Sequence, residues 1–262
     1  MVKMNKKLSI LGCGWLGFPL AISLIQKGYQ INGSVTSPHK LKRLKENGIN
    51  SFIVDIGKTT NNYNEFLDAN VLIIAIPPRN IEFFKMLLKN IEKVNLKKVL
   101  FISSISVYPL SNEIVTEETS IDQSPLSEIE ALFKSSKKSK TTILRFGGLF
   151  GYDRKPGNFI RKGQKLKNPE GHVNLIHRDD CIQIIQGIIH SNIWGETFNA
   201  CTDSHPKRKE FYKNEILKIG GDEPLLDLDS ENRYKIVSSE KLKTMLNFSF
   251  KYSDLLNLSY ND

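Results

Sequence analysis

Residues 7–36 carry the pattern that most constrains the fold of this chain. A short apolar strand, Lys7–Leu11, is followed by the turn G-x-G-x-x-G, a helical run that ends in glycine and a second strand. In such a unit Gly12 permits the tight turn, Gly14 lets phosphates approach the backbone, and Gly17 lets helix and strand pack closely. The helix then directs free N–H groups and the positive end of its dipole at the phosphates. The segment therefore predicts a site for a dinucleotide pyrophosphate.

The residues on both sides of the turn strengthen this prediction. Leu16, Leu20 and Leu24 fall on one face of the following helix, and Gly28 stands where a C-capping glycine belongs. A strand–turn–helix unit without a ligand is the alternative, but three glycines at this spacing have little structural use without a phosphate. A secretory signal is not favoured, because the apolar stretch before Cys13 is shorter than a signal core of roughly 7–15 residues.

Strand-like runs recur along the first half of the chain, with helical patterns between most of them. The fourth run, Val71–Ile76, is apolar throughout, as expected for a strand covered on both faces. The alternation predicts an α/β fold with a doubly wound parallel sheet, the Rossmann fold. The predicted strands are Lys7–Leu11, Gln30–Val35, Ser51–Asp55, Val71–Ile76, Lys98–Ser103 and Thr141–Phe146, and the predicted helices include His39–Asn47, Asn80–Val94 and Ser127–Ser136.

The remainder of the chain differs in character. Residues 152–172 read as loop, and Asp179 or Asp180 can cap the helix that follows. We expect a dinucleotide-binding core over 1–151 and a small C-terminal α/β lobe on the substrate side over 152–262, with 173–200 returning to the core sheet. Within the lobe the predicted elements are the strands Glu196–Asn199 and Tyr234–Val237 and the helices Lys207–Ile219 and Ser238–Leu246.

The composition excludes several classes of protein. Cys13, Cys181 and Cys201 form no C-x-x-C pair, so neither a disulfide framework nor a metal site is expected, and a cytoplasmic location fits. No apolar run approaches the roughly 18 residues of a membrane span. The net charge of +9 comes mostly from lysines spread along the chain, without interleaved aromatic residues. Neither a membrane nor a specific nucleic acid is therefore an expected partner.

Several motifs resemble those of the extended and atypical short-chain dehydrogenase/reductases, the NAD-dependent epimerase/dehydratase group. They are, in chain order, the strand end Val54–Ile56, the segment Ile102–Tyr108 (similar to S-S-x-x-V-Y), Arg145–Gly151 (R-P-x-x-x-Y-G), Asn174–Asp180 (N-F-I-H-V-D-D) and Gly195–Asn199 (G-E-x-Y-N). The resemblance covers nearly the whole chain. It implies a nicotinamide cofactor, a small-molecule substrate and, in many members, a homodimer.

The chain departs from this family at its catalytic pair. Family enzymes use Tyr-x-x-x-Lys, in which the lysine holds the nicotinamide ribose and lowers the pKa of the tyrosine. Here Leu126 stands in the tyrosine position and Glu130 in the lysine position. Leucine transfers no proton and glutamate supplies no positive charge, so the standard mechanism is not available. The departure best matches the atypical branch, which keeps the fold and the cofactor site.

The expected cofactor site combines the glycine turn with the ends of the neighbouring strands. The second strand lacks the acidic residue that usually binds the adenosine ribose of NAD. Thr36 and Ser37 can donate to a 2′-phosphate that Lys40 or Arg43 neutralises, which favours NADP(H) over NAD(H). A solvated basic helix start is the alternative. The resemblance assigns an adenine contact to Asp55. The predicted cofactor-binding residues are Gly12, Gly14, Trp15, Leu16, Gly17, Thr36, Ser37, Lys40, Asp55, Ile56, Ala75, Ile76, Pro77 and Ser103.

Three side chains are candidates for catalysis. Ser104 occupies the family position that hydrogen-bonds a substrate carbonyl or hydroxyl, and capping of backbone groups at the strand end is the alternative. Tyr108 is the nearest phenol, although the matching family tyrosine is mainly structural or substrate-lining. His177 can titrate near neutral pH, although the family histidine is mostly a structural hydrogen-bonding residue.

Two functions fit these observations. The first is an NAD(P)-dependent oxidoreductase or epimerase/dehydratase-like enzyme that acts on a small polar substrate, such as a nucleotide sugar. The second is a catalytically silent NADP(H)-binding sensor or scaffold protein. Leu126 and Glu130 favour the second function, whereas the serine-rich strand end and the C-terminal lobe favour the first.

Overall fold

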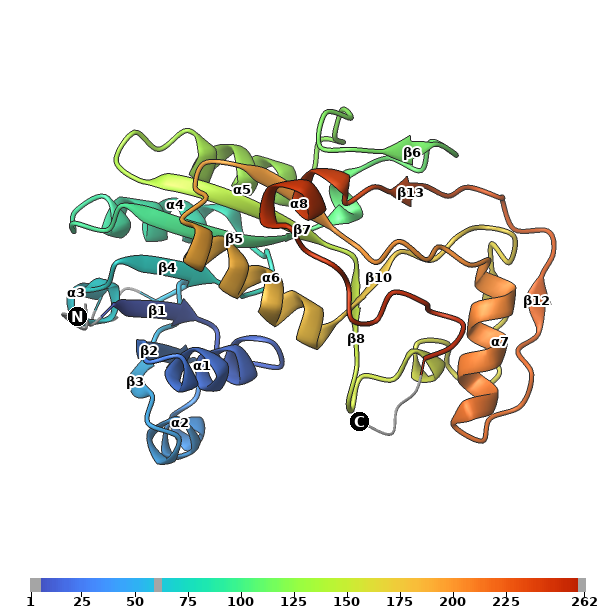
Figure 1. The fold of residues 1–262 in the computed structure, drawn as a ribbon, viewed down its shortest axis with the longest axis horizontal. Coiled ribbons are helices and arrows are strands. Elements are labelled where there is room, and N and C mark those ends of the chain that lie inside the picture. Colours follow the sequence, from blue (N-terminus) through green and yellow to red (C-terminus); the bar gives the residue numbers. More distant parts are fainter. Residues whose placement is uncertain (1–5, 59–62, 259–262) are drawn as a thin grey trace. The chain divides into compact units, whose positions relative to one another are not determined.

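The structure is a computed structural model that describes residues 6–58 and 63–258. Its main element is a seven-stranded sheet (Figure 1). Its strands are β1 (Lys7–Leu11), β2 (Gln30–Val35), β3 (Asn50–Ile53), β4 (Val71–Ile74), β5 (Lys98–Ser104), β7 (Lys140–Phe146) and β11 (Thr197–Ala200). They lie in the order β11-β7-β5-β4-β1-β2-β3. The pairs β1–β2, β1–β4, β2–β3 and β4–β5 are parallel. The predicted Rossmann fold is therefore confirmed, with the reversal of strand order between β1 and β4.

Two compact units divide the chain. Unit 1 combines Met1–Ser103, Gln123–Leu144 and Ile185–Thr197, and unit 2 combines Ser104–Asp122, Arg145–Ile184 and Phe198–Asp262. Each unit is thus assembled from three separate segments of the chain. The expected division into a core over 1–151 and a lobe over 152–262 stays a prediction.

The helices of unit 1 connect its parallel strands. α1 (Gly17–Gln26) follows the glycine turn and buries Leu20, Ala21 and Leu24, as its apolar spacing predicts. α4 (Ile81–Ile91) begins after Asn80, whose side-chain oxygen accepts a hydrogen bond from the backbone N–H of Glu82 at 2.9 Å. The other helices here are α2 (Leu41–Glu46), α3 (Tyr63–Leu67) and α5 (Pro125–Lys134), and α6 (Arg178–Ser191) contributes residues to both units.

α5 begins earlier than the predicted start at Ser127 because of a capping box. The hydroxyl of Ser124 accepts from the backbone N–H of Ser127 at 3.2 Å, and the hydroxyl of Ser127 accepts from the backbone N–H of Ser124 at 2.9 Å. Pro125 then occupies the first helical position, where its missing N–H costs nothing. The Ser-Pro dipeptide was a start signal that the periodicity of apolar residues did not reveal.

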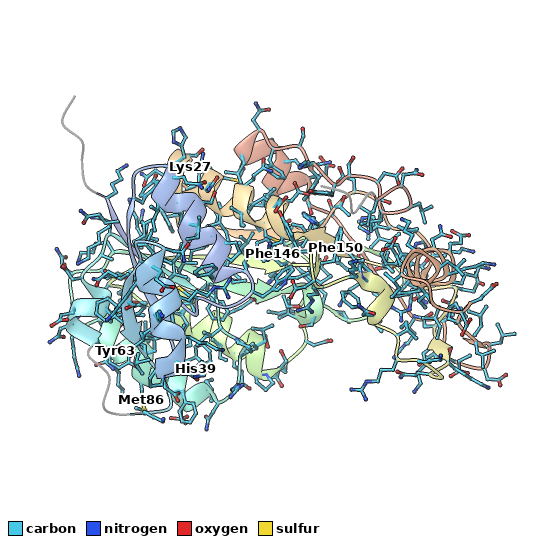
Figure 2. All side chains as sticks on the ribbon, turned by 90° about the horizontal axis from the view of Figure 1, so that it is seen from below. Lys27, His39, Tyr63, Met86, Phe146 and Phe150 are labelled. Atoms are coloured by element: carbon cyan, nitrogen blue, oxygen red, sulfur yellow. The ribbon has the colours of Figure 1, made fainter. Side chains whose placement is uncertain are left out.

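Unit 2 has an apolar core of its own. Its core residues include Phe150, Leu166, Phe211 and Leu255, and Phe146 and Phe150, labelled in Figure 2, are both buried. Short parallel ladders join β8 to β10, β9 to β12 and β6 to β13. The elements are β6 (Ile114–Val115), β8 (Gly148–Phe150), β9 (Leu166–Lys167), β10 (Leu175–His177), α7 (Arg208–Lys218), β12 (Leu226–Asp227), β13 (Ile236–Val237) and α8 (Glu240–Leu246).

Neither Asp179 nor Asp180, the two alternative caps that the sequence predicted, caps α6, because both lie inside its first turn. α6 begins at Arg178, so Asp180 lies inside its first turn and is buried. Its carboxylate accepts hydrogen bonds from the backbone N–H groups of Lys251 at 2.8 Å and Tyr252 at 3.2 Å. Burial raises the pKa of Asp180, and these two hydrogen bonds oppose the shift. The carboxylate therefore binds the backbone of Lys251 and Tyr252 to the first turn of α6.

Three features of the described residues bear on a membrane span, a disulfide and a metal site. None of their helices has the length and apolar character that crossing a membrane requires. The three cysteines are free and buried. Histidine, cysteine and acidic side chains in this part of the chain form no group of three or more that could hold a metal ion.

Candidate functional site

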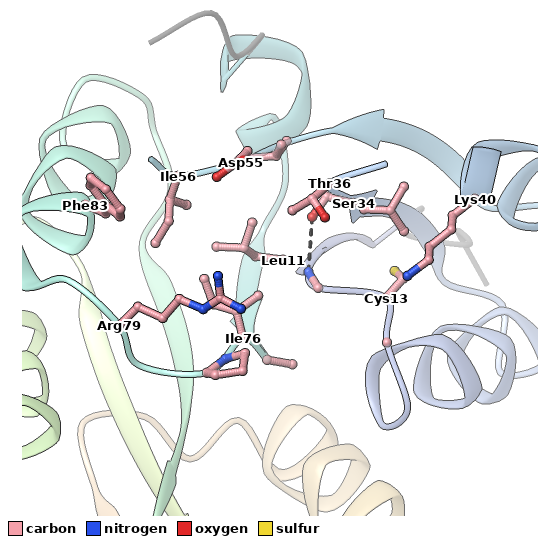
Figure 3. A pocket seen from close by; sticks show the side chains of 16 residues that line it. Leu11, Cys13, Ser34, Thr36, Lys40, Asp55, Ile56, Ile76, Arg79 and Phe83 are labelled. Carbon is pink, nitrogen blue, oxygen red and sulfur yellow. Dashed lines mark hydrogen bonds between the residues drawn. The ribbon is translucent and has the colours of Figure 1, made fainter. Parts of the chain in front are cut away.

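A cavity of about 380 Å³ lies at the carboxyl ends of β1 to β4 (Figure 3). Its walls are the glycine turn after β1, the end of β2 and the loops that follow β3 and β4. All of these residues belong to unit 1. The cavity thus occupies the point where the strand order reverses, which is where open α/β sheets bind their ligands.

The three glycines of the turn have different steric surroundings. Gly12 has a φ of 100°, and a Cβ there would lie 2.6 Å from Cγ2 of Ile76 and 2.8 Å from the carbonyl oxygen of Ala75. A Cβ at Gly17 would overlap the carbonyl oxygen of Gly12. Gly14 is exposed, and a Cβ there would meet no protein atom within 4 Å. Gly12 and Gly17 are therefore required by the turn itself, whereas Gly14 leaves open space beside the cavity.

Ser34 on β2 holds the turn in place. Its hydroxyl accepts a hydrogen bond from the backbone N–H of Gly12 at 3.1 Å, drawn in Figure 3, and its carbonyl oxygen accepts from the N–H of Cys13 at 2.8 Å. Burial raises the pKa of the Cys13 thiol to about 12, so this cysteine lines the cavity as a neutral group and not as a nucleophile. Ser34 therefore fixes the turn through two hydrogen bonds to its backbone.

The charged groups of the cavity are mostly positive. Lys40 and Arg79 line it and are exposed, and Asp55 is the acidic residue among the lining residues that the structure describes. Asp55 accepts from the backbone N–H of Gly57 at 3.1 Å and lies 3.8 Å from the ammonium group of Lys58. α1 carries no acidic residue in its first turn. The field at the start of α1 therefore favours an anion.

The structure gathers most of the predicted cofactor-binding residues around this cavity. Those that line it are Gly12, Gly14, Thr36, Lys40, Asp55, Ile56, Ala75, Ile76 and Pro77, and those that do not are Trp15, Leu16, Gly17, Ser37 and Ser103. Lining residues absent from that prediction are Leu11, Cys13, Ser34, Val35, Val54, Arg79 and Phe83. Several of them end or follow a strand, so their nearness to the strand ends was the available signal. Cofactor binding by any of them stays a prediction.

The two positions at which the family carries its catalytic tyrosine and lysine lie in α5. Leu126 is buried, and Glu130 is only 1% exposed. The Ser103 hydroxyl donates a hydrogen bond to the Glu130 carboxylate at 2.5 Å. Glu130 therefore joins the end of β5 to α5, in the place where the resemblance expects a cation.

The candidate catalytic residue Ser104 acts as a local cap. Its hydroxyl accepts a hydrogen bond from the backbone N–H of Ser106 at 3.1 Å, which begins the short 3-10 turn Ile105–Val107. Ser104 is half-buried, whereas Ser106 is exposed. The hydroxyl hydrogen of Ser104 is not used by this contact, so the side chain can still donate to another group.

Tyr108 has the environment of a structural residue. Its hydroxyl donates to Oδ1 of Asn199 at 2.9 Å and accepts from the guanidinium of Arg145 at 2.6 Å, and the residue is 2% exposed. Burial raises the pKa of Tyr108, and Arg145 opposes the shift. Because both hydrogen-bonding capacities of the phenol are used, this placement favours the structural interpretation over a catalytic one.

His177 lies in an aromatic cluster of unit 2. Its ring centroid is 3.6 Å from that of Tyr252, 5.2 Å from Phe150 and 5.6 Å from Tyr152. The backbone N–H of Asp179 donates to Nδ1 of His177 at 3.2 Å, so this nitrogen carries no proton. Burial lowers the pKa of His177 to about 4, against the opposing charge of Asp179. His177 is therefore neutral at pH 7 and packed as a core residue.

Comparison with known proteins identifies relatives of both the first segment and the whole chain. Residues 7–106 match the family described as NADP oxidoreductase coenzyme F420-dependent. The protein YeeZ of Escherichia coli strain K12 is 30% identical over 272 residues, which cover 96% of this chain and 98% of YeeZ.

Solved structures share the fold over nearly the whole chain. A functionally unknown protein from Silicibacter pomeroyi superposes with a TM-score of 0.82 at 18% identity, covering 96% of this chain and 95% of that one. UDP-glucuronic acid 4-epimerase from Bacillus cereus, in complex with NAD, superposes with a TM-score of 0.75 at 19% identity, covering 97% of each chain. The expected resemblance to epimerase/dehydratase proteins is thus confirmed at the level of the fold.

Replacing Glu130 should destabilise the protein. Glu130→Ala leaves the buried Ser103 hydroxyl without this acceptor, so we expect the free energy of unfolding to fall by about 1–3 kcal/mol in urea denaturation. Glu130→Gln keeps an acceptor oxygen and should cost less. Glu128→Ala, an exposed glutamate of the same helix, is the matched control. Equal stability of the Glu130→Ala and Glu128→Ala variants would contradict a structural role for Glu130.

His177 should make the stability depend on pH. Its pKa in the folded protein, about 4, lies below the ordinary value of 6.5, so the unfolded state binds the proton first. The free energy of unfolding should therefore decline as the pH falls from about 6.5 towards 4, with a slope of up to about 1.4 kcal/mol per pH unit. His177→Gln should flatten this slope. His39→Gln, at an exposed position labelled in Figure 2, should leave it unchanged, and equal slopes in both variants would exclude His177 as the cause.

Proposed function

The chain belongs to the same protein family as YeeZ of Escherichia coli, and from this premise we propose that its cavity binds a nicotinamide dinucleotide, NADP(H) in preference to NAD(H). The observation that carries the proposal is the open space at Gly14, which lines the cavity and is separated from the start of α1 by Trp15 and Leu16. A pyrophosphate there would approach the backbone without meeting a side chain, at the positive end of the α1 dipole. The family match of residues 7–106 supports the same assignment.

The preference for NADP(H) rests on the residues that end β2. Thr36 and Lys40 line the cavity, and no acidic residue stands with them at this strand end. An NAD site usually carries an acid here, which binds the ribose hydroxyls and repels a 2′-phosphate. Lys40 would neutralise that phosphate, and Thr36 would donate a hydrogen bond to it. Asp55, on the neighbouring β3 end, is the residue for the adenine contact that the resemblance implies.

We further propose that the protein is an oxidoreductase or an epimerase/dehydratase-like enzyme acting on a small polar substrate, with a nucleotide sugar as the leading class. The bound nicotinamide would supply the hydride donor or acceptor. Among the residues, Ser104 keeps a hydroxyl hydrogen that can be donated to a substrate carbonyl. The fold shared with a UDP-glucuronic acid 4-epimerase supports this substrate class. The free, buried cysteines agree with a cytoplasmic location.

One observation favours a second function, a catalytically silent NADP(H) sensor or scaffold. Leu126 and Glu130 take the positions of the family's catalytic pair and are both buried in the packing of α5. Tyr108 and His177 are likewise engaged in structural contacts. Ser104 therefore becomes the residue on which the two functions make different predictions.

Cofactor choice can be tested by thermal unfolding. NADP(H) at about 100 times its Kd should stabilise the protein by about 2.7 kcal/mol, a rise in Tm of about 5 °C or more for a chain of this size. NAD(H) at the same concentration should give a smaller rise. Lys40→Ala should reduce the NADP(H) response towards that of NAD(H). Gly14→Ala should abolish both responses while leaving the Tm without ligand nearly unchanged, because its Cβ meets no protein atom. Stabilisation by NAD alone would contradict the preference.

Catalysis can be tested by single-turnover hydride transfer in both directions. In a panel of substrates, carbonyl compounds should oxidise bound NADPH, and nucleotide sugars should reduce bound NADP+ by transferring hydride from a hydroxyl-bearing carbon. If the protein is an enzyme, Ser104→Ala should slow the responsive reaction by about 100-fold, the usual cost of removing a hydrogen-bond donor from a developing oxyanion. Ser106→Ala removes a nearby exposed hydroxyl and is the matched control. An unchanged rate in Ser104→Ala would exclude this role for Ser104, and silence across the panel would favour the sensor.

A further inference from the structure

A second cavity of unit 1, of about 700 Å³, lies at the amino ends of strands whose carboxyl ends form the first cavity. Leu8 of β1 and Val71 of β4 line it, whereas Leu11 and Ala75, at the other ends of these strands, line the first one. The remaining walls come from the end of α6, the loop before β2 and the start of β5. The second cavity is therefore separate from the proposed cofactor site.

The side chains of this second cavity combine positive charge with aromatic rings. Lys6 and Lys98 supply two ammonium groups, and Tyr29 and Trp194 supply two half-buried rings. Among the described residues that line the cavity, none is an aspartate or a glutamate. The surroundings therefore favour an anion that also has a planar group.

Trp194 and Lys98 are held in fixed positions by a shared partner, Asn192. The ammonium group of Lys98 donates to Oδ1 of Asn192 at 2.6 Å, and the indole N–H of Trp194 donates to the same oxygen at 3.0 Å. Asn192 is in the left-handed conformation, with a φ of 57°, and lies just after α6. The Lys98 nitrogen is 5.7 Å from the centre of the Trp194 ring. The ammonium group lies over the ring, so a cation and a ring are positioned together before any ligand arrives.

We propose that this second cavity binds a mononucleotide. The base would stack on Trp194, and the phosphates would meet the ammonium groups of Lys98 and Lys6. Lys98 has three N–H donors, and the contact with Asn192 uses one of them. The volume lies within the range of about 300–1,000 Å³ that is typical of small-molecule sites. A single-stranded nucleic acid would require a longer track of positive charge, so a small nucleotide fits this pair of lysines better.

The two tryptophans of the chain allow a direct test. They are Trp15 and Trp194, so Trp15→Phe leaves Trp194 as the reporter in the second cavity. Titration of this variant with ADP should quench the remaining fluorescence in a saturable manner. Adenosine alone and inorganic phosphate alone should each bind more weakly than ADP. The proposal does not depend on the cofactor assignment, because the readout arises at Trp194.

A pair of adjacent lysines provides the matched control. In the Trp15→Phe background, Lys98→Ala should weaken the affinity for ADP by at least about tenfold, the effect of losing a charge-assisted hydrogen bond. Lys97→Ala removes the same charge from an exposed neighbour that does not line the cavity, and should leave the affinity unchanged. Lys6→Ala changes an exposed position and should also weaken ADP binding. It replaces Lys98→Ala as the test if that variant does not fold.

Four results would overturn the proposal. The first is the absence of a saturable response to ADP. The second is equal affinity for ADP in the Lys98→Ala and Lys97→Ala variants, which would place the binding elsewhere. The third is a response to phosphate as strong as that to ADP, which would indicate a simple anion site without stacking. A short single-stranded RNA that binds through Lys98 when ADP does not would likewise replace the mononucleotide by a nucleic acid.

Discussion

The contact between Gly17 and the carbonyl oxygen of Gly12 is the constraint on which the rest of the first cavity depends. Because a side chain at Gly17 would overlap this oxygen, α1 can start directly against the end of β1 only with glycine there. With α1 in this position, Gly14 faces open space, and the hydroxyl of Ser34 on β2 holds the turn through the backbone N–H of Gly12. The positive groups of the cavity then surround a position already prepared by backbone geometry.

The sequence predicted the fold well where one short-range pattern decides the structure. The six predicted strands of the core are all present, because strand-like runs alternate with helical patterns and are bounded by glycine and polar segments, which leaves few alternatives. The predicted capping role of Asp180 is wrong, because the partners of its carboxylate, Lys251 and Tyr252, are distant in the sequence. Ser34 was missed for a related reason: its contact with Gly12 exists only once β1 and β2 pair. Long-range polar contacts of this kind leave no periodic signal.

The candidate catalytic residues show how burial changes the meaning of a side chain. Tyr108 and His177 are residue types that commonly carry protons in enzymes, yet here the phenol has two partners and the imidazole is neutral among aromatic rings. Glu130 differs from these two residues. Its place at the position of the family lysine indicated the loss of a catalytic group, and the structure shows that its carboxylate instead accepts a hydrogen bond from Ser103. Residue type alone could have distinguished none of these roles.

The segmented construction of the two units has a consequence for the order of folding. Asp180 meets backbone groups 71 and 72 residues further along, and closing so long a loop costs entropy before the contact repays it. The glycine turn, by contrast, is held by Ser34, which lies only 22 residues from Gly12. During synthesis the glycine turn can therefore form early, whereas unit 2 stays open until the segment around Tyr252 has left the ribosome. In that interval its apolar core residues are exposed to chaperones and to aggregation.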